Sequence, residues 1–256
     1  MRWARAGRPA ELLVLLALLG TWQAATVLLQ VPPYLVPQPI ALVASLGPFK
    51  QRLVADAAQT IAEALAGFVG GNLLGLALAV VFTHSRLLER TFLPWMVILK
   101  TLPIVAITPL ITLVLGFGAP TIVAIASLIS FFPALVNGVL GLRSVSPQSL
   151  ELLRLLNASE WIVLRRLRLP SALPSIFAAL RVSGPASILA AMVAEWAAAN
   201  SGLGYLILDA GAQYQFLLMW DGILVATGLA VAAFAVVDFA EGHLTAWARH
   251  QSLPQP

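Results

Sequence analysis

Three charged side chains lie inside stretches that otherwise carry no charge: Lys100, Arg181 and Glu195. Charges within membrane-spanning segments face protein or a water-filled cavity and often mark a transport pathway. At 1.5 Å per residue from the nearest polar boundary, Lys100 and Arg181 lie about 15 Å deep, and Glu195 lies about 21 Å beyond Arg181. The two cations suit an anionic solute, and Glu195 suits an outer loop or gate. Pairing with neighbouring groups or reaching towards the headgroups is the alternative for each cation.

Small residues recur every four positions at Gly67, Gly71 and Gly75. This spacing puts them on one helical face, where a second backbone can approach closely. We expect the stripe to serve helix packing within the subunit; contact with a second copy or a moving seam is the alternative. Gly202 and Gly204 belong to a glycine-rich segment, 201–207, which predicts either an ordinary turn or an outer gate.

The sequence lacks the common motifs for ATP hydrolysis, metal-dependent hydrolysis and serine-dependent hydrolysis. It contains no glycine-rich phosphate loop ending in Lys, no His-Glu-x-x-His and no Gly-x-Ser-x-Gly. Cysteine is absent, which excludes disulfides, thiolate metal sites and a cysteine nucleophile. We therefore predict no catalytic residue, metal site or cofactor in this chain, and we expect that it is not an enzyme.

The elements that must position these residues are apolar and long. Of 256 residues, 60% are hydrophobic and 10% charged, and the mean hydropathy is +0.91. Soluble domains are about 45–50% apolar and about 25% charged. Although the net charge is +4, this composition excludes a soluble enzyme, a disordered chain and a nucleic-acid-binding module. It predicts an all-α polytopic membrane protein.

Six apolar runs predict about six transmembrane helices, since one crossing needs about 20 residues. Their expected positions are 12–31, 64–83, a run starting at Thr91, 121–140, 171–199 and 217–237. Five crossings are the alternative, because Pro103 and Pro109 break the third run. Residues 53–63 are amphipathic and predict a helix lying at the outer surface. A cleaved signal peptide is the alternative for the first run.

The basic residues predict the orientation, because cytoplasmic loops carry an excess of Lys and Arg. With the N-terminus in the cytosol, only Lys50 and Arg52 fall outside. Eleven arginines fall inside, namely Arg2, Arg5, Arg8, Arg86, Arg90, Arg143, Arg154, Arg165, Arg166, Arg168 and Arg249. We therefore expect a cytosolic tail at 1–11, a transmembrane domain at 12–245 and a second cytosolic tail at 246–256.

The long polar interruption at 146–170 predicts two short helices around a tight bend at the cytosolic surface. Ser146 is a good N-cap for the first helix. An apolar stripe follows on Leu150, Leu152, Leu153 and Leu156. Asn157 tolerates the left-handed conformation that ends helices. Ser159 can cap the second short helix, which contains Trp161 to Leu167.

The spacing in this segment resembles the EAA motif of permease subunits of ABC importers, E-A-A-x-x-x-G and then, after nine residues, I-x-L-P. The motif falls on Glu151, Leu152, Leu153, Asn157, Leu167, Leu169 and Pro170. Leucines replace the two alanines, and asparagine replaces the glycine. Residues 157–161, 169–174 and 201–207, with Phe131-Phe132-Pro133, are similar to the nitrate, sulfonate and taurine branch. The resemblance covers roughly residues 55 to 245.

This resemblance implies an ABC importer type I permease, with segment 146–170 as its coupling segment, in a bacterial inner membrane. It implies a second permease copy forming a homodimer, separate ATPase subunits that hold ATP and magnesium, and an extracytoplasmic solute-binding protein. The residues implied to couple to the ATPase are Glu151, Leu152, Leu153, Leu156, Asn157, Ala158, Ser159, Leu169 and Pro170. The implied substrate is a small anion such as nitrate, an alkanesulfonate or taurine, with a pyrimidine or thiamine precursor as the alternative.

Other functions stay open from the residues alone. An ion-coupled secondary carrier would show internal halves with broken helices, and we find no such repeat. A membrane scaffold would anchor a cytosolic partner without transporting anything. The leucine-bearing helix of segment 146–170 would then simply lie on lipid headgroups, as other amphipathic helices do.

Overall fold

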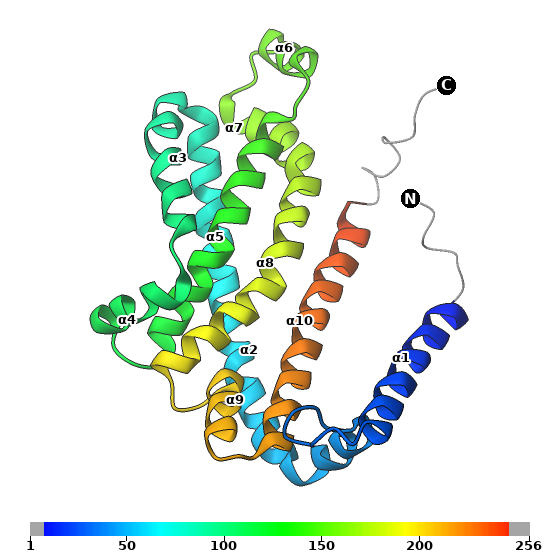
Figure 1. The fold of residues 1–256 in the computed structure, drawn as a ribbon. Coiled ribbons are helices and arrows are strands. Elements are labelled where there is room, and N and C mark those ends of the chain that lie inside the picture. The colour runs from blue at the N-terminus through cyan, green and yellow to red at the C-terminus, as the bar shows by residue number, and fades with distance from the viewer. Residues whose placement is uncertain (1–7, 246–256) are drawn as a thin grey trace.

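The computed structural model describes residues 8–245, which form helices joined by loops, with no strand in that range (Figure 1). The long helices α2, α5, α8 and α10 form a bundle, and α8 runs antiparallel to the other three. The elements are α1 (Arg8–Leu28), α2 (Pro39–His84), α3 (Arg86–Thr101), α4 (Ile104–Leu115), α5 (Ala119–Arg143), α6 (Pro147–Leu155), α7 (Glu160–Val163), the π-helical turn η2 (Leu164–Arg168), α8 (Leu169–Ala198), α9 (Leu203–Ala212) and α10 (Phe216–Leu244). The predicted all-α class is confirmed.

Four helical stretches within residues 8–245 are long and apolar enough to cross a membrane. They are α2, α5, the stretch Glu160–Ala198, and α10. Three further apolar stretches are shorter: residues Leu13–Leu28 within α1, Ile104–Leu115 and Leu203–Ala212. Of the six predicted runs, the third is divided between two helices, and the first falls in α1, whose 21 residues match the length that one crossing needs.

The third predicted crossing is not one helix. α3 ends at Thr101 and α4 begins at Ile104, with Pro103 in an extended conformation between them. Proline lacks an N–H and disfavours the helical conformation of the residue before it. Pro109, by contrast, lies inside α4. With 12 residues, α4 is about 18 Å long and falls short of a hydrocarbon layer about 30 Å thick.

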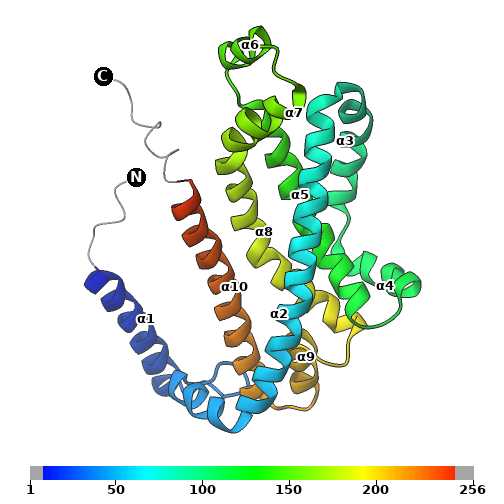
Figure 2. The ribbon, with the colours of Figure 1, turned by 180° about the vertical axis from the view of Figure 1, so that it is seen from behind.

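α2 corrects a second expectation, because its 46 residues form one continuous helix about 69 Å long. The structure thus joins the surface helix expected at 53–63 to the crossing expected at 64–83. Leu53 and Ala57 are buried as their pattern predicts, against α9 and α10. These contacts pack the part of α2 that precedes residues 64–83, so no break is needed. The first turns of α2 curve beneath the bundle (Figure 2).

The glycine stripe lies where α2 packs against α5. A Cβ on Gly67 or Gly75 would overlap α5 atoms, and one on Gly71 would come within 2.9 Å of the Ser127 carbonyl carbon. Only residues without a side chain allow this approach of the two backbones. The structure therefore places the stripe inside the subunit.

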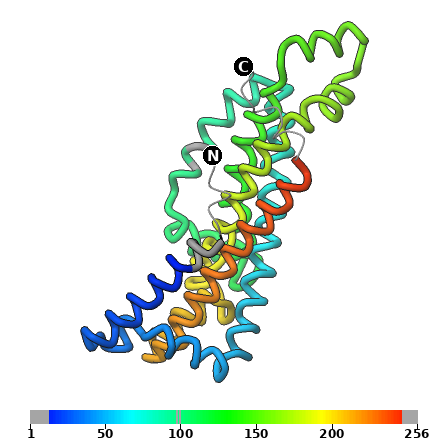
Figure 3. The backbone as a smooth tube through the Cα atoms, turned by 90° about the vertical axis from the view of Figure 1, so that its right-hand side faces the viewer, coloured from blue at the N-terminus to red at the C-terminus, as the bar shows by residue number. Residues whose placement is uncertain are grey.

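The core runs along α5, which lies between α2 and α8. One buried cluster, near the α6 end, includes Phe82, Leu135 and Leu142, and a second, towards α9, includes Ile122 and Ile125. α1 stands apart from this core (Figure 3). From Leu13 to Leu28, most of its apolar side chains are exposed. Residues 8–11, expected in the N-terminal tail, belong to α1. Residues 1–7 and the predicted tail 246–256 lie outside the described residues.

Candidate functional site

The hairpin of residues 146–159 projects beyond the ends of α2, α5 and α8 (Figure 1). Its helix α6 starts as predicted: the Ser146 hydroxyl accepts a hydrogen bond from the Ser149 N–H at 3.2 Å. Its end is also as predicted, because Asn157 has a left-handed backbone with φ 52°. Two backbone bonds close the bend, Asn157 N–H to the Arg154 carbonyl and Ala158 N–H to the Leu153 carbonyl, both 3.0 Å. This double closure is the Schellman motif.

The second arm of the hairpin differs from the expected short helix. Ser159 caps it, accepting from the Ile162 N–H at 3.4 Å, but the helix continues through α7 and η2 into α8. The helix that contains the fifth predicted crossing thus begins at Glu160, before the run expected from Ser171. Two features carry the helix on: Leu164 is buried in the core, and the wide π turn accommodates Pro170, which has no N–H to donate. Leu169 and Pro170 lie half-buried at the start of α8.

No residue of α6 is buried. Leu152, Leu155 and Leu156 expose 58%, 81% and 69% of their surface. They share one face of the helix, three and four residues apart. Glu151 is also exposed, and Leu153 and Ala158 are half-buried. Leu155 is absent from the motif-based prediction, although the same spacing could have identified it.

At the opposite end of the bundle, Glu195 is fully buried. One carboxylate oxygen accepts a hydrogen bond from the Thr60 hydroxyl at 2.7 Å, and the other accepts from the Gly204 N–H at 2.6 Å. Glu195 therefore joins α2, the end of α8 and the start of α9. We call these three residues, with Asp56 and Gly202, the outer network, because the sequence predicts an outer position for Glu195.

α2 supplies two further contacts to the same loop. The Asp56 carboxylate accepts from the Gly202 N–H at 2.9 Å, and the Thr60 hydroxyl accepts from the Leu203 N–H at 2.8 Å. The sequence analysis did not identify Asp56 or Thr60. Together with Glu63 they recur four and three residues apart, which would have indicated one polar helical face.

Both glycines of this loop are required by their surroundings. Gly202 has φ 102°, and a Cβ there would meet the Glu195 carboxylate; a Cβ on Gly204 would meet the Met192 backbone. The expected glycine-rich loop 201–207 is shorter in the structure, because α9 begins at Leu203. Backbone N–H groups at the start of a helix lack partners within it, and α2 and Glu195 supply those partners here.

An ion pair fastens α9 to α2. The Arg52 guanidinium donates to the Asp209 carboxylate at 2.7 Å. This hydrogen bond, helped by Gln213, lowers the pKa of Asp209 from its ordinary value. A carboxyl with a lowered folded pKa contributes stability above its unfolded value of about 4. The contact is thus complete at neutral pH and is lost only as the pH falls through the lower folded value.

Removing the Glu195 carboxylate is expected to destabilise the outer network. Glu195→Ala leaves the Gly204 N–H buried without this acceptor, at about 1–3 kcal/mol, while the Thr60 hydroxyl can still donate to the Asp56 carbonyl at 3.1 Å. Thermal unfolding in detergent measures the loss. Glu160→Ala is the control, since that carboxylate is 67% exposed and should change stability by less than about 0.5 kcal/mol. A wild-type melting temperature for Glu195→Ala would contradict the assignment.

The two cations do not form one site. Arg181 pairs with Asp238 and Glu241 of α10, each at 3.2 Å, so its charge is compensated. Lys100 is exposed at the end of α3, and no ion pair involves it within residues 8–245. Figures 1 and 2 show α3 and α10 on opposite sides of the bundle. For Arg181 the structure therefore shows the alternative expectation, which is pairing with neighbouring groups rather than a free charge for an anionic solute.

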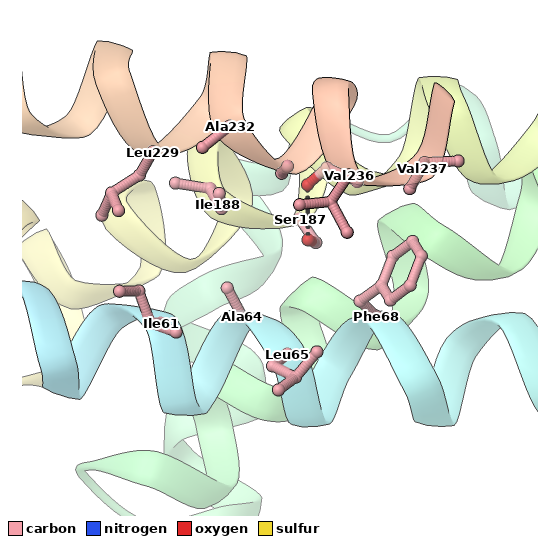
Figure 4. Close-up of a pocket in the computed structure, with 12 residues that line it drawn as sticks. Ile61, Ala64, Leu65, Phe68, Ser187, Ile188, Leu229, Ala232, Val236 and Val237 are labelled. Carbon is pink, nitrogen blue, oxygen red and sulfur yellow. Dashed lines mark hydrogen bonds between the residues drawn. The ribbon is translucent and has the colours of Figure 1, made fainter. Parts of the chain in front are cut away.

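An apolar cavity of about 310 Å³ lies between α2, α8 and α10 (Figure 4). Phe68, Ile188 and Val236 are among its lining residues, and Ser187 brings its one polar side chain. That hydroxyl already donates to the Gly184 carbonyl at 2.8 Å. The cavity therefore presents an apolar surface to any molecule that enters it, and no charged side chain lines it.

Comparison with known proteins gives a consistent result. Residues 71–249 match the family described as "Binding-protein-dependent transport system inner membrane component". A probable ABC transporter permease protein of Haemophilus influenzae is 32% identical over 89% of this chain and 93% of its own length. The formylaminopyrimidine transport permease protein of Halalkalibacterium halodurans is 31% identical (86% and 88% covered). A putative aliphatic sulfonates transport permease protein of Bacillus subtilis is 29% identical (95% and 89%).

Among solved structures, the fold is similar to a chain of the inward-facing MetNI methionine ABC transporter. The TM-score is 0.68 at 18% identity, over 77% of this chain and 98% of that one. At this identity the likeness concerns the fold alone.

Proposed function

Because this chain belongs to the binding-protein-dependent inner membrane components, the permease subunits of ABC importers, we propose that separate ATPase subunits drive it through the 146–159 hairpin. We further propose that two copies form the pathway and that a solute-binding protein delivers the substrate at the α9 end. The coupling residues would be the exposed face of α6 with Glu151 and the bend at Asn157–Ser159. ATP and magnesium would be held by the ATPase subunits.

The single observation that carries this proposal is the unpartnered apolar face of α6. Leu152, Leu155 and Leu156 are exposed on a helix that contacts no other element closely and projects away from the bundle. Burying a leucine is worth about 1.5–3 kcal/mol, so this face favours a partner groove. A helix lying on headgroups would instead be expected at the level where the spans end.

We propose that the chain is oriented in the membrane with the hairpin on the cytosolic side, where the ATPase subunits would bind. The hairpin lies at one end of the bundle, where α5 ends at Arg143 and η2 leads into α8, and the loop between α8 and α9 lies at the other end. The excess of basic residues favours the cytosol for the hairpin end. The N-terminus would then be cytosolic and α1 would lead outward. Cysteine introduced at Arg154 should react with an impermeant label only from the cytosolic side; labelling from outside would overturn the proposal.

For the substrate we propose a small, uncharged heterocycle of the pyrimidine-precursor kind, in place of a small anion. Two observations support it: Arg181 is compensated by Asp238 and Glu241, and the cavity lining is apolar. A relative named for formylaminopyrimidine transport is 31% identical. An alkanesulfonate is the second candidate, from the relative named for sulfonate transport.

Reconstituted uptake tests the class of transporter. Proteoliposomes with this chain and its ATPase should accumulate labelled substrate only when the binding protein and ATP are supplied. Vesicles without ATPase, given a proton or sodium gradient, should show background uptake. Uptake driven by the gradient alone would identify an ion-coupled carrier and contradict the proposal. Competition between a pyrimidine and an alkanesulfonate for the binding protein then tests the substrate.

A further inference from the structure

A cavity of about 480 Å³ opens where the start of α3 meets the end of α5. It is separate from the exposed face of α6, the outer network and the apolar cavity. Its lining residues are Arg86, Glu89, Arg90, Leu93, Pro94 and Arg143. Three guanidinium groups thus surround one carboxylate, and Leu93 and Pro94 supply the apolar part of the lining.

Arg143 and Glu89 satisfy one another. The Arg143 guanidinium donates to both Glu89 oxygens, at 2.8 and 2.6 Å, and to the Phe82 carbonyl at 2.9 Å. The Glu89 side chain is only 16% exposed. This bidentate pair fixes one wall of the cavity and occupies its only carboxylate.

Arg86 and Arg90 have no such partner. Both are exposed, and no ion pair involves either of them in the described part of the chain. They lie four residues apart on one face, where like charges repel. They also lie at the start of α3, where positive charge opposes the helix dipole. An anion between them would relieve both unfavourable effects.

The position of the cavity indicates which anion. The candidate spans α2 and α5 both end here, at His84 and Arg143, so the cavity lies at the boundary of the hydrocarbon layer. Phe92 and Trp95 of α3 are 48% and 65% exposed, and aromatic residues gather at the headgroup level. Phosphodiesters are abundant there, and guanidinium groups bind phosphate oxygens in pairs.

We propose that this cavity binds the phosphate of an anionic phospholipid, held by Arg86 and Arg90. The Arg143–Glu89 pair positions the wall behind it, and the acyl chains extend past Leu93 into the hydrocarbon layer. Basic pockets between membrane helices recognise cardiolipin and related headgroups by this chemistry. The site goes beyond transport and coupling, and it would exist whichever solute the permease carries.

The test uses the purified full chain after delipidation, titrated with phosphatidylglycerol or cardiolipin in detergent and followed by native mass spectrometry. The double variant R86Q/R90Q should bind these lipids about tenfold or more weakly. R165Q/R166Q is the matched control: it removes the same charge from two exposed arginines of η2 and should bind like wild type. Both variants should melt like wild type in phosphatidylcholine, which separates binding from folding.

Three results would overturn the proposal. Equal weakening in both double variants would indicate diffuse attraction rather than a pocket. Equal retention of phosphatidylcholine would show that the headgroup charge is not recognised. Displacement of the lipid by millimolar inorganic phosphate, with R86Q/R90Q abolishing phosphate binding, would assign the cavity to a soluble anion.

Discussion

Replacing Leu152, Leu155 and Leu156 with serine is expected to abolish ATP-driven uptake while leaving the permease folded. The three side chains expose 58%, 81% and 69% of their surface and contact little of their own chain. If each loses about 1.5 kcal/mol of burial in a partner, ATPase binding weakens on the order of 10³-fold. Co-purification with the ATPase and vesicle uptake measure the two consequences.

The control for this experiment lies on the same helix. Arg154 is exposed on the face of α6 opposite the leucines, and Arg154→Gln should leave co-purification and uptake near the wild-type level. The triple serine variant should also retain the wild-type melting temperature without ATPase, because no residue of α6 is buried. Undiminished ATPase binding by the triple variant would refute the coupling role of this face.

Gly71→Val is expected to prevent stable folding of the bundle. A side chain at this position would overlap the Ser127 backbone and approach the Ser130 Cβ at 2.9 Å. Overpacking a core typically costs about 1–3 kcal/mol, and a rigid backbone neighbour places this case above that range. We expect loss of the monodisperse species in size-exclusion chromatography and a large fall in the yield of membrane-inserted protein.

Gly228→Val provides the matched control for the same chemical change. Gly228 is also helical, in α10, but a Cβ there would meet nothing within 4 Å. Valine in a helix is no worse than glycine, so this variant should melt within a few degrees of wild type. A stable, correctly sized Gly71→Val protein would show that α2 and α5 do not approach as closely as described.

The hairpin was the most predictable part of the site, because its conformation depends on neighbouring residues. Ser146 caps α6 through a bond three residues away, and Asn157 ends it through its own backbone preference. Such preferences are visible in the sequence without knowledge of the fold. The same holds for the glycine stripe, whose spacing alone predicts one close-packed face.

The outer network and the pairing of Arg181 were harder to predict from the sequence. Glu195 was expected to hold an outer loop, but its partner Thr60 lies 135 residues earlier in the chain. Arg181 is paired by residues 57 or more positions away, on α10. Contacts at such separations depend on how the helices pack, and helical periodicity describes only one helix at a time.

By itself, the sequence determined the membrane class, the helical architecture and the local bends, because apolar length, proline positions and caps act over a few residues. The tertiary structure decided that α2 runs unbroken, that the helix of the fifth predicted crossing starts at Glu160, and which charges are compensated. These outcomes depend on buried contacts between distant segments, and only the packed bundle brings those segments together.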